Sequence, residues 1–400
     1  MTPRTSIPKP LVIVLVLSFF MFTAHNLILS ALQDFVLYIS GDTSALGISF
    51  GIFTGFAFMF RFISGRIIER SSVTLMLALG QVMLSVVFIS YAALGAIIEI
   101  YVLRVFHGIA WALATVAIMT AVVQRSPPSR VGEGLGYYNG VNSFAMMVFP
   151  AVGSAMAMMN THEAYDFLFT MTCAVSLVAI AVAVVIWRTN RPEQSSDAPH
   201  SGGFVSRAAL RPSLSIFVLS FGFGAVLSYS PSIAAMHNVA NSGLYFTWFA
   251  GSMVVGYAVG GFLSDRRGHS MMSAIGCCCM AIGLLLAAIG TEYFTYVVSA
   301  CALGIGLSLA NVALNALASL VVSESDQARA MATYSAGMDG GIMVGSFMIA
   351  ILLNAGLELP VILMILVGFA FITVLNTPGL DRMESIYRSR DRDHALGESA

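Results

Sequence analysis

Three side chains could carry a charge or a proton inside otherwise apolar segments of this sequence. Asp339 lies near the middle of a long apolar run, within the stretch Gly337–Gly341. A carboxylate at that depth in a membrane is costly unless it is neutralised, so Asp339 is a candidate proton site or ligand for a cationic substrate group. Arg104 cannot lose its proton and needs acceptors, whereas His25 can titrate in the working pH range.

Each of these residues also has a purely structural interpretation. A protonated Asp339 could hydrogen-bond between helices that pack closely on glycine. Arg104 could couple proton movement to the first apolar run or merely tie two helices together; at its depth that run offers His25 and Asn26, with Asp34 closer to the surface. A lone histidine in an apolar helix is often a satisfied hydrogen-bonding residue, so the sequence leaves both roles of His25 open.

A second set of polar residues could line a substrate cavity together with Asn26. Asn311 and Asn315 are four residues apart and therefore share one helix face. They either face a cavity or hydrogen-bond a neighbouring helix. The other candidates are Tyr138 and Asn142 in one apolar run and Tyr229 in another, just before a proline that should kink its helix.

The composition identifies the elements that must hold these residues. Of the 400 residues, 58% are hydrophobic and 10% are charged, and the mean hydropathy is +0.86. So little charge cannot cover a water-soluble protein of this size. Apolar runs of about 20 residues recur along the whole chain, as in a polytopic helical membrane protein embedded in the lipid bilayer. The net charge of −1 favours no nucleic-acid partner, and the five cysteines lack the spacing of a metal site.

Twelve membrane spans fit the sequence, and one longer connection divides them into two halves. That connection is charged and rich in Pro, Ser and Gly, as a linker should be. We expect an N-terminal six-helix bundle at 1–188, a cytoplasmic linker at 189–212, a C-terminal six-helix bundle at 213–378 and a soluble, poorly ordered tail at 379–400. The expected spans are about 11–33, 45–66, 73–95, 98–123, 134–158, 165–187, 213–236, 244–264, 270–290, 294–321, 328–353 and 358–377.

Basic residues predict the orientation of these spans. With the N-terminus inside, the inner segments contain many arginines and the outer loops contain none. The outer loops instead contain acids, among them Asp34, Asp42 and Glu99. We therefore expect a multi-pass protein of the inner (plasma) membrane with both termini in the cytoplasm.

Two inner turns repeat at an interval of 196 residues, and the same interval relates Tyr138 to Tyr334. Two like-oriented halves follow the parallel-repeat plan of a secondary transporter. In each turn the acid, Glu69 or Asp265, could dock on the N-terminus of another helix, where negative charge is favoured, and so close the inner gate. Alternatively these charges only set the topology. The residues of this candidate gate are Gly65, Glu69, Arg70, Gly261, Asp265, Arg266 and Gly268.

The turns and one helix motif resemble those of the major facilitator superfamily. The family's inner-loop motif Gly-x-Leu-x-Asp-Arg-x-Gly is complete at Gly261–Gly268, and the copy at Gly65–Ser72 keeps only part of it. Arg104 and Gly108 match the family's Arg-x-x-x-Gly motif, in which the arginine is implicated in proton coupling. Arg61, which precedes Gly65, also resembles the arginine found at this place in the drug–proton antiporter branch of the family.

The resemblance implies an all-α membrane protein with twelve transmembrane helices in two pseudo-symmetric bundles that work by alternating access. The sequence has no Walker loop and no recognisable enzyme site, so we expect neither catalysis nor a cofactor or metal. We expect a monomeric transporter that exports a small amphipathic or zwitterionic compound, of drug or metallophore type, in exchange for protons. The alternatives are proton-coupled uptake of a sugar, amino acid or organic acid, and a membrane sensor that moves no solute.

Overall fold

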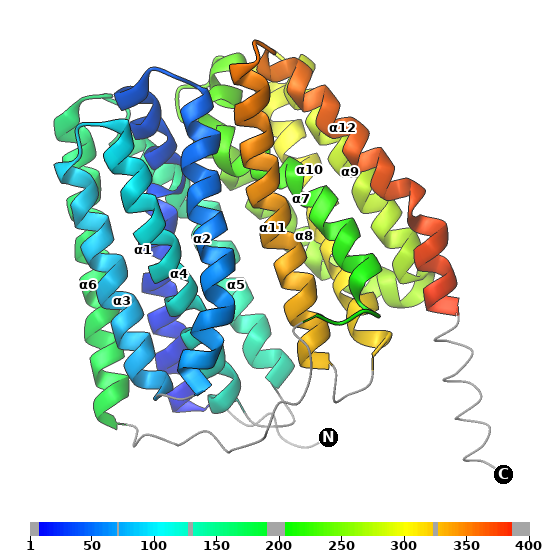
Figure 1. Ribbon diagram of the computed structural model, residues 1–400, viewed down its shortest axis with the longest axis horizontal. Coiled ribbons are helices and arrows are strands. Elements are labelled where there is room, and N and C mark those ends of the chain that lie inside the picture. Colours follow the sequence, from blue (N-terminus) through cyan, green and yellow to red (C-terminus); the bar gives the residue numbers. More distant parts are fainter. Residues whose placement is uncertain (1–7, 70–71, 127–130, 190–204, 323–326, 386–400) are drawn as a thin grey trace. The chain divides into compact units, whose positions relative to one another are not determined.

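The computed structural model describes residues 8–69, 72–126, 131–189, 205–322 and 327–385. Within these ranges the chain forms α-helices, one short 3-10 turn (Tyr91–Ala93) and no strand. Figure 1 labels the α-helices. Their bounds are α1 Lys9–Ser40, α2 Ser44–Glu69, α3 Val73–Ser90, α4 Ile97–Arg125, α5 Val131–Met156, α6 His162–Thr189, α7 Leu210–Met236, α8 Leu244–Arg267, α9 His269–Ile289, α10 Tyr293–Leu320, α11 Gln327–Asn354 and α12 Leu359–Leu375.

The helices have the length and composition of membrane spans. In the described part of the chain ten are long and apolar enough to cross a bilayer, and α8 adds a shorter apolar stretch, Leu244–Gly260. Large apolar side chains remain exposed along the helices, Phe106 at 52% and Phe371 at 52% among them. Such surfaces suit lipid rather than water. The expected all-α membrane fold with twelve helices is confirmed.

The chain divides into two compact units. The first contains α1–α6 together with residues 240–247, which are the end of the connection between α7 and α8 and the first turn of α8, and the second contains α7, α8 from Trp248 onward and α9–α12. We call residues 240–247 the 240–247 connection. The helix starts repeat between the units: α3, α4 and α5 begin at residues 73, 97 and 131, and α9, α10 and α11 begin at residues 269, 293 and 327. The interval of 196 residues seen in the turns therefore extends to the helices themselves.

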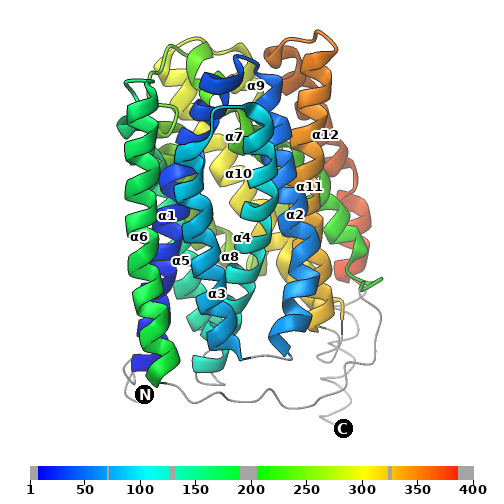
Figure 2. The same cartoon turned by 60° about the vertical axis from the view of Figure 1, so that its left-hand side comes forward.

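Within each unit, helices distant in sequence pack side by side. In the first unit α1 packs on α5 and α6, α2 packs on α4, and α3 packs on both α4 and α6; Figure 2 shows α6 beside α1. In the second unit the closest pairs are α9 with α10 and α7 with α11, and α12 packs on α9. The kink expected in α7 is present, since Tyr229 has φ −115° and ψ 19° just before Pro231.

The structure corrects the expected end of the first span. We predicted a span ending near residue 33 with Asp34 in an outer loop, but α1 continues to Ser40. Phe35 and Val36 are fully buried and extend the apolar face of the helix past Asp34. The helix ends only at Gly41, whose φ of 63° is a left-handed conformation that glycine adopts readily. Asp34 is therefore a helical residue.

The first residues of the segment expected to be a poorly ordered tail are helical, whereas residues 386–400 of that tail lie outside the described part of the chain. A break at Asn376 ends α12, but residues 377–385 are again helical. The Glu384 carboxylate accepts hydrogen bonds from the backbone N–H groups of His269, at 3.1 Å, and Ser270, at 3.0 Å. Asp381 accepts one from the Ser270 hydroxyl at 2.5 Å. These acids cap the N-terminus of α9, where unpaired N–H groups and the helix dipole favour negative charge.

Candidate functional site

Arg104 on α4 is buried among partners from α2. The side chain is 3% exposed, and its Nε donates a hydrogen bond to the Ser49 hydroxyl at 3.0 Å. Its guanidinium carbon lies 5.7 Å from the ring centroid of Phe50 and 5.3 Å from that of Phe53. The faces of aromatic rings and a hydroxyl group can stabilise a cation that is buried away from water. The hydrogen bond to Ser49 therefore ties α4 to α2, rather than to α1 as depth alone suggested.

Two histidines lie beside this guanidinium. His25 on α1 stacks on Trp111 with ring centroids 3.8 Å apart and planes 20° apart. Its ring also meets His107 edge-on at 5.6 Å. His107 is fully buried, and its Nδ1 lies 3.1 Å from the Tyr91 hydroxyl, which also interacts with Arg104. We call His25, Tyr91, Arg104, His107 and Trp111 the histidine–arginine cluster.

The cluster can hold a fixed positive charge next to two groups that bind protons. In the described residues, Nδ1 of His25 and Nε2 of His107 are buried without a hydrogen-bond partner. Buried polar atoms are nearly always paired, so two such atoms in one cluster mark it as a candidate site for a proton or a substrate. Sequence reasoning singled out His25 and Arg104. The spacing of Arg104, His107 and Trp111 at i, i+3 and i+7 places them on one face of α4. This spacing was the sequence signal that could have indicated His107 and Trp111.

The predicted cavity residues of the first unit lie on α1 and α5. Asn26 is 3% exposed and donates to the backbone carbonyl of Phe22 at 2.8 Å, one turn earlier in its own helix. Tyr138 is 8% exposed and its ring centroid lies 5.3 Å from that of Phe22. Asn142, one turn along α5, is half-buried. Phe22 thus links Asn26 and Tyr138.

The predicted cavity residues of the second unit separate into two groups. The Asn311 amide donates to the Tyr257 hydroxyl at 3.1 Å and accepts from the Tyr334 hydroxyl at 2.7 Å, which joins α10 to α8 and α11. Asn315, one turn further along, is exposed. Tyr229 at the kink of α7 is fully buried. The structure therefore brings Asn311 into an interhelical network and leaves Asn315 outside it.

Asp339 lies on α11 where that helix packs closely on α7. The side chain is half-buried, and its Oδ2 atom is shielded from solvent. Gly341, two residues further, stands against the backbone carbonyl of Phe217 with no room for a Cβ atom. Gly340 faces the Phe217 ring. The glycines thus let two helix backbones approach directly beside the carboxylate.

The candidate inner gate lies only partly within the described residues. Gly65 and Glu69 are in the last turns of α2, Gly261 and Asp265 are in the last turns of α8, and Gly268 precedes α9. Arg266 is exposed. Arg70 and the side chains of Glu69 and Asp265 lie outside the described part. The gate therefore stays a prediction, although the tail residue Glu384 caps the helix that starts directly after Gly268.

Comparisons with known proteins find a matching protein family and solved structures with a similar fold. The family model described as Major Facilitator Superfamily matches residues 11–241 and 212–382. Among solved structures, a bacterial homologue of the human lysosomal transporter Spinster, inward-facing and unoccupied, has 15% sequence identity and a TM-score of 0.75, covering 94% of this chain and 97% of that one. A comparison with curated protein sequences finds no match.

Two other solved transporters have the same fold. A POT family transporter in complex with 5-aminolevulinic acid has a TM-score of 0.77 and 11% identity, covering 93% of this chain and 97% of that one. The nucleoside transporter NupG has a TM-score of 0.72 and 13% identity, covering 93% of this chain and 99% of that one. The chain is thus a multi-pass secondary transporter that belongs to the Major Facilitator Superfamily.

Proposed function

We propose that this transporter couples the export of a small amphipathic or zwitterionic compound to the entry of protons. The observation that carries the proton coupling is the histidine–arginine cluster. In it a permanent cation, Arg104, lies next to two imidazoles, and one buried nitrogen of each, Nδ1 of His25 and Nε2 of His107, has no hydrogen-bond partner among the described residues. A proton on either imidazole would place a second positive charge beside this cation, so a proton that enters the cluster changes the interactions within it.

Asp339 is the proposed second half of the coupling. A carboxylate within a membrane span can neutralise itself with a proton or with the cationic group of a substrate. Exchange between these two partners at one carboxylate would link the two fluxes. A proton that crosses a potential of 100 mV releases about 2.3 kcal/mol, which is enough to drive a useful concentration ratio of the exported compound.

The direction and the substrate class are inferred from sequence motifs and from solved transporters of similar fold. Arg61 and the complete Gly261–Gly268 motif resemble the drug–proton antiporter branch, which favours export. A POT family transporter of similar fold is described in complex with 5-aminolevulinic acid, and another in complex with alafosfalin. The first of these is a small zwitterion, which shows that this fold can enclose that chemistry. Drug- and metallophore-like compounds with an amine and an acid are therefore the first candidates.

Alternating access is the proposed mechanism, with Asp265 and Arg266 of the second inner turn, and Glu69 and Arg70 of the first, forming the inner gate. In our proposal the protein works as a monomer in the inner membrane with both termini in the cytoplasm, as the distribution of arginines indicates. Asn26, Tyr138, Asn142, Tyr229, Asn311 and Asn315 remain the candidates for substrate contacts, and Asn311 has the strongest local support because it already bonds two tyrosines.

The decisive experiment uses purified protein in liposomes with an imposed pH gradient and a panel of zwitterions, drugs, sugars, amino acids and nucleosides. Export predicts that a compound moves against the proton flow and that its addition dissipates the gradient. Movement of compound and proton in the same direction would establish uptake instead. Failure of every compound to move under any gradient would favour a membrane sensor.

A further inference from the structure

A polar network involving Asp34 joins three separate pieces of the first unit. One Asp34 carboxylate oxygen, Oδ2, accepts hydrogen bonds from the Ser242 hydroxyl at 2.9 Å and the Ser154 hydroxyl at 3.4 Å. Ser242 also pairs with the Ser30 hydroxyl at 2.5 Å and with Ser154 at 3.2 Å. Ser30 and Asp34 are on α1, Ser154 is on α5, and Ser242 belongs to the connection between α7 and α8. We call these four residues the serine clasp.

The backbone around the serine clasp is closely fitted. The Asn241 amide donates to the backbone carbonyl of Ala151 at 3.0 Å. Gly243 stands against the backbone carbonyl of Pro150, and Gly153 against that of Leu27, in each case without space for a Cβ atom. Residues 240–247 accordingly belong to the first unit although α7 and most of α8 do not. The connection is thus seated on α1 and α5 by both its backbone and its side chains.

The Asp34 carboxylate has no basic partner in the described part of the chain. Its hydrogen-bond donors are the two serine hydroxyls, and no Lys, Arg or His among the described residues forms an ion pair with it. Tyr165 on α6 interacts electrostatically with Asp34, and the ring centroid of Tyr38, on α1 itself, lies 5.4 Å from that of Tyr165. Tyr245 is the titratable group of the 240–247 connection and is fully buried. The Asp34 carboxylate is thus surrounded by serine hydroxyls and tyrosine phenols.

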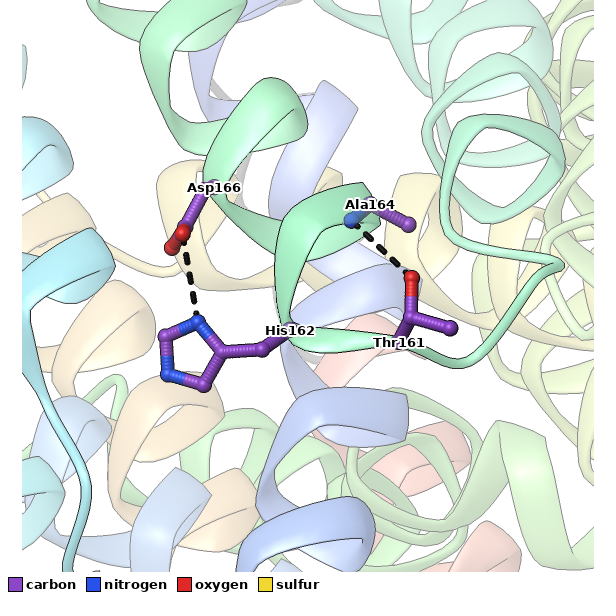
Figure 3. Close-up of polar contacts among 4 residues, drawn as sticks. All are labelled: Thr161, His162, Ala164 and Asp166. Carbon is purple, nitrogen blue, oxygen red and sulfur yellow. Dashed lines mark hydrogen bonds and ion pairs between the residues drawn. The ribbon is translucent and has the colours of Figure 1, made fainter.

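His162 and Asp166, two titratable residues in the first turns of α6, pair with one another. His162 Nδ1 lies 3.2 Å from Asp166 Oδ2 at the start of that helix (Figure 3). The His162 ring also meets the ring of Phe35, the residue after Asp34, edge-on at 6.4 Å. Because the His162 imidazole is paired with Asp166, this histidine does not neutralise Asp34. A proton is therefore the neutralising partner that remains for the Asp34 carboxylate.

We propose that Asp34 is a further proton-binding residue of this transporter and that its protonation loosens the connection between α7 and α8 from α1 and α5. This inference rests on the proposed proton coupling. While Asp34 is ionised, Ser242 and Ser154 each direct their single proton to it, and such charge-assisted bonds are about twice as strong as neutral ones. A proton on the carboxylate removes that charge. It also turns one carboxyl oxygen into a hydrogen-bond donor. The serine hydroxyls then no longer all direct their protons toward Asp34.

The inference is tested by hydrogen–deuterium exchange of residues 240–247 in nanodiscs at one fixed pH. Asp34→Asn imitates the protonated acid, and Ser242→Ala removes the closer donor. We expect both variants to exchange at least threefold faster than the wild type in this segment, and Ser154→Ala, whose bond is longer, to show a smaller increase. Unchanged exchange in Asp34→Asn and Ser242→Ala would overturn the proposal.

A matched control is Asp42→Asn, because Asp42 also accepts from a serine hydroxyl, that of Ser44 at 2.6 Å, but outside the serine clasp. It should leave exchange of residues 240–247 unchanged. If Asp34→Asn does not fold, Ser242→Ala alone decides the outcome. Exchange is measured without transport, so a chain that proves not to move protons can still show the clasp, and an intact proton flux with unchanged exchange refutes the clasp alone.

Discussion

The two units share one helix plan but differ in where they contain charge. In the first unit α4 carries Arg104 and His107, and both are buried in a cluster of aromatic and hydroxyl groups. The residues 196 positions later, on α10, are Ala300 and Leu303, and both are fully buried. The helix repeat therefore supplies the scaffold twice, whereas the polar chemistry of α4 occurs once.

The second unit has its own exception to the repeat. Asp339 corresponds to Ser143 in the first unit, and it lies among glycines that bring α11 onto α7. Charge in the first unit is thus an enclosed cation with imidazoles, and in the second unit it is a half-buried acid between close backbones. A transporter that couples two fluxes needs groups that respond to different partners, and this difference provides them.

The largest effect is expected when the acid of the second unit is neutralised. Asp339→Asn should abolish proton-coupled flux, because an amide can neither bind a proton from water nor neutralise a cationic group. The protein should remain folded and inserted, since the amide has nearly the shape of the carboxyl. Flux in liposomes measures the effect, and Ser143→Ala, its repeat partner, is the control expected to stay near wild-type activity. Wild-type flux in Asp339→Asn would remove the acid from the coupling.

Replacement of the enclosed cation should have the next largest effect. Arg104→Lys keeps the charge, but an ammonium cannot reproduce the planar contact with Phe50 and Phe53 together with the bond to Ser49. We expect proton-coupled flux to fall at least tenfold. Arg207→Lys, at an exposed arginine, should change nothing. Equal activity of the two variants would mean that any cation suffices in the cluster.

An intermediate effect is expected when one imidazole is replaced by the residue that its repeat partner uses. His25 corresponds to Phe221, and His25→Phe can keep the stack on Trp111 while removing the titratable ring. We expect a three- to tenfold loss of flux and a flatter dependence of flux on pH, with an unchanged melting temperature. A pH profile identical to that of the wild type would show that His25 only packs.

The smallest effect concerns stability. Glu384→Ala removes the carboxylate from two backbone N–H groups at the start of α9 and should cost about 1 kcal/mol of folding free energy, as the loss of a helix cap does. Thermal unfolding in detergent measures this, with Ser385→Ala, at an exposed position, as the control. An unchanged transition temperature would mean that the tail helix rests on α9 without stabilising it.

The repeat contained more information about the helices than the prediction used. An interval of 196 residues carries the end of α7 at Met236 to position 40, where α1 ends, and the end of α6 at Thr189 to position 385, up to which the described part of the tail is helical. Both errors arose because each span was judged by its own hydropathy, which falls at Asp34 and after Pro378. For both the end of α1 and the helical tail, the position in the repeat predicted the helix better than local hydropathy did.

The partners of the candidate site residues were harder to predict. Depth in the membrane placed Arg104 level with His25, but it could not show that Ser49 and Phe53 of α2 face the guanidinium. Likewise no local pattern joins Asp34 to Ser242, because 208 residues separate them. Such contacts depend on the rotation of each helix about its axis, which only the packing of the whole unit determines.

The stack of His25 on Trp111 provides an optical reporter inside the protein. The chain has three tryptophans, and the indole of Trp111 faces the His25 imidazole at 3.8 Å. Because a cationic imidazole interacts with the face of an indole differently from a neutral one, the fluorescence of Trp111 should follow the charge of His25. With Trp187 and Trp248 replaced by phenylalanine, emission from unlabelled protein would screen compounds and pH values in a cuvette.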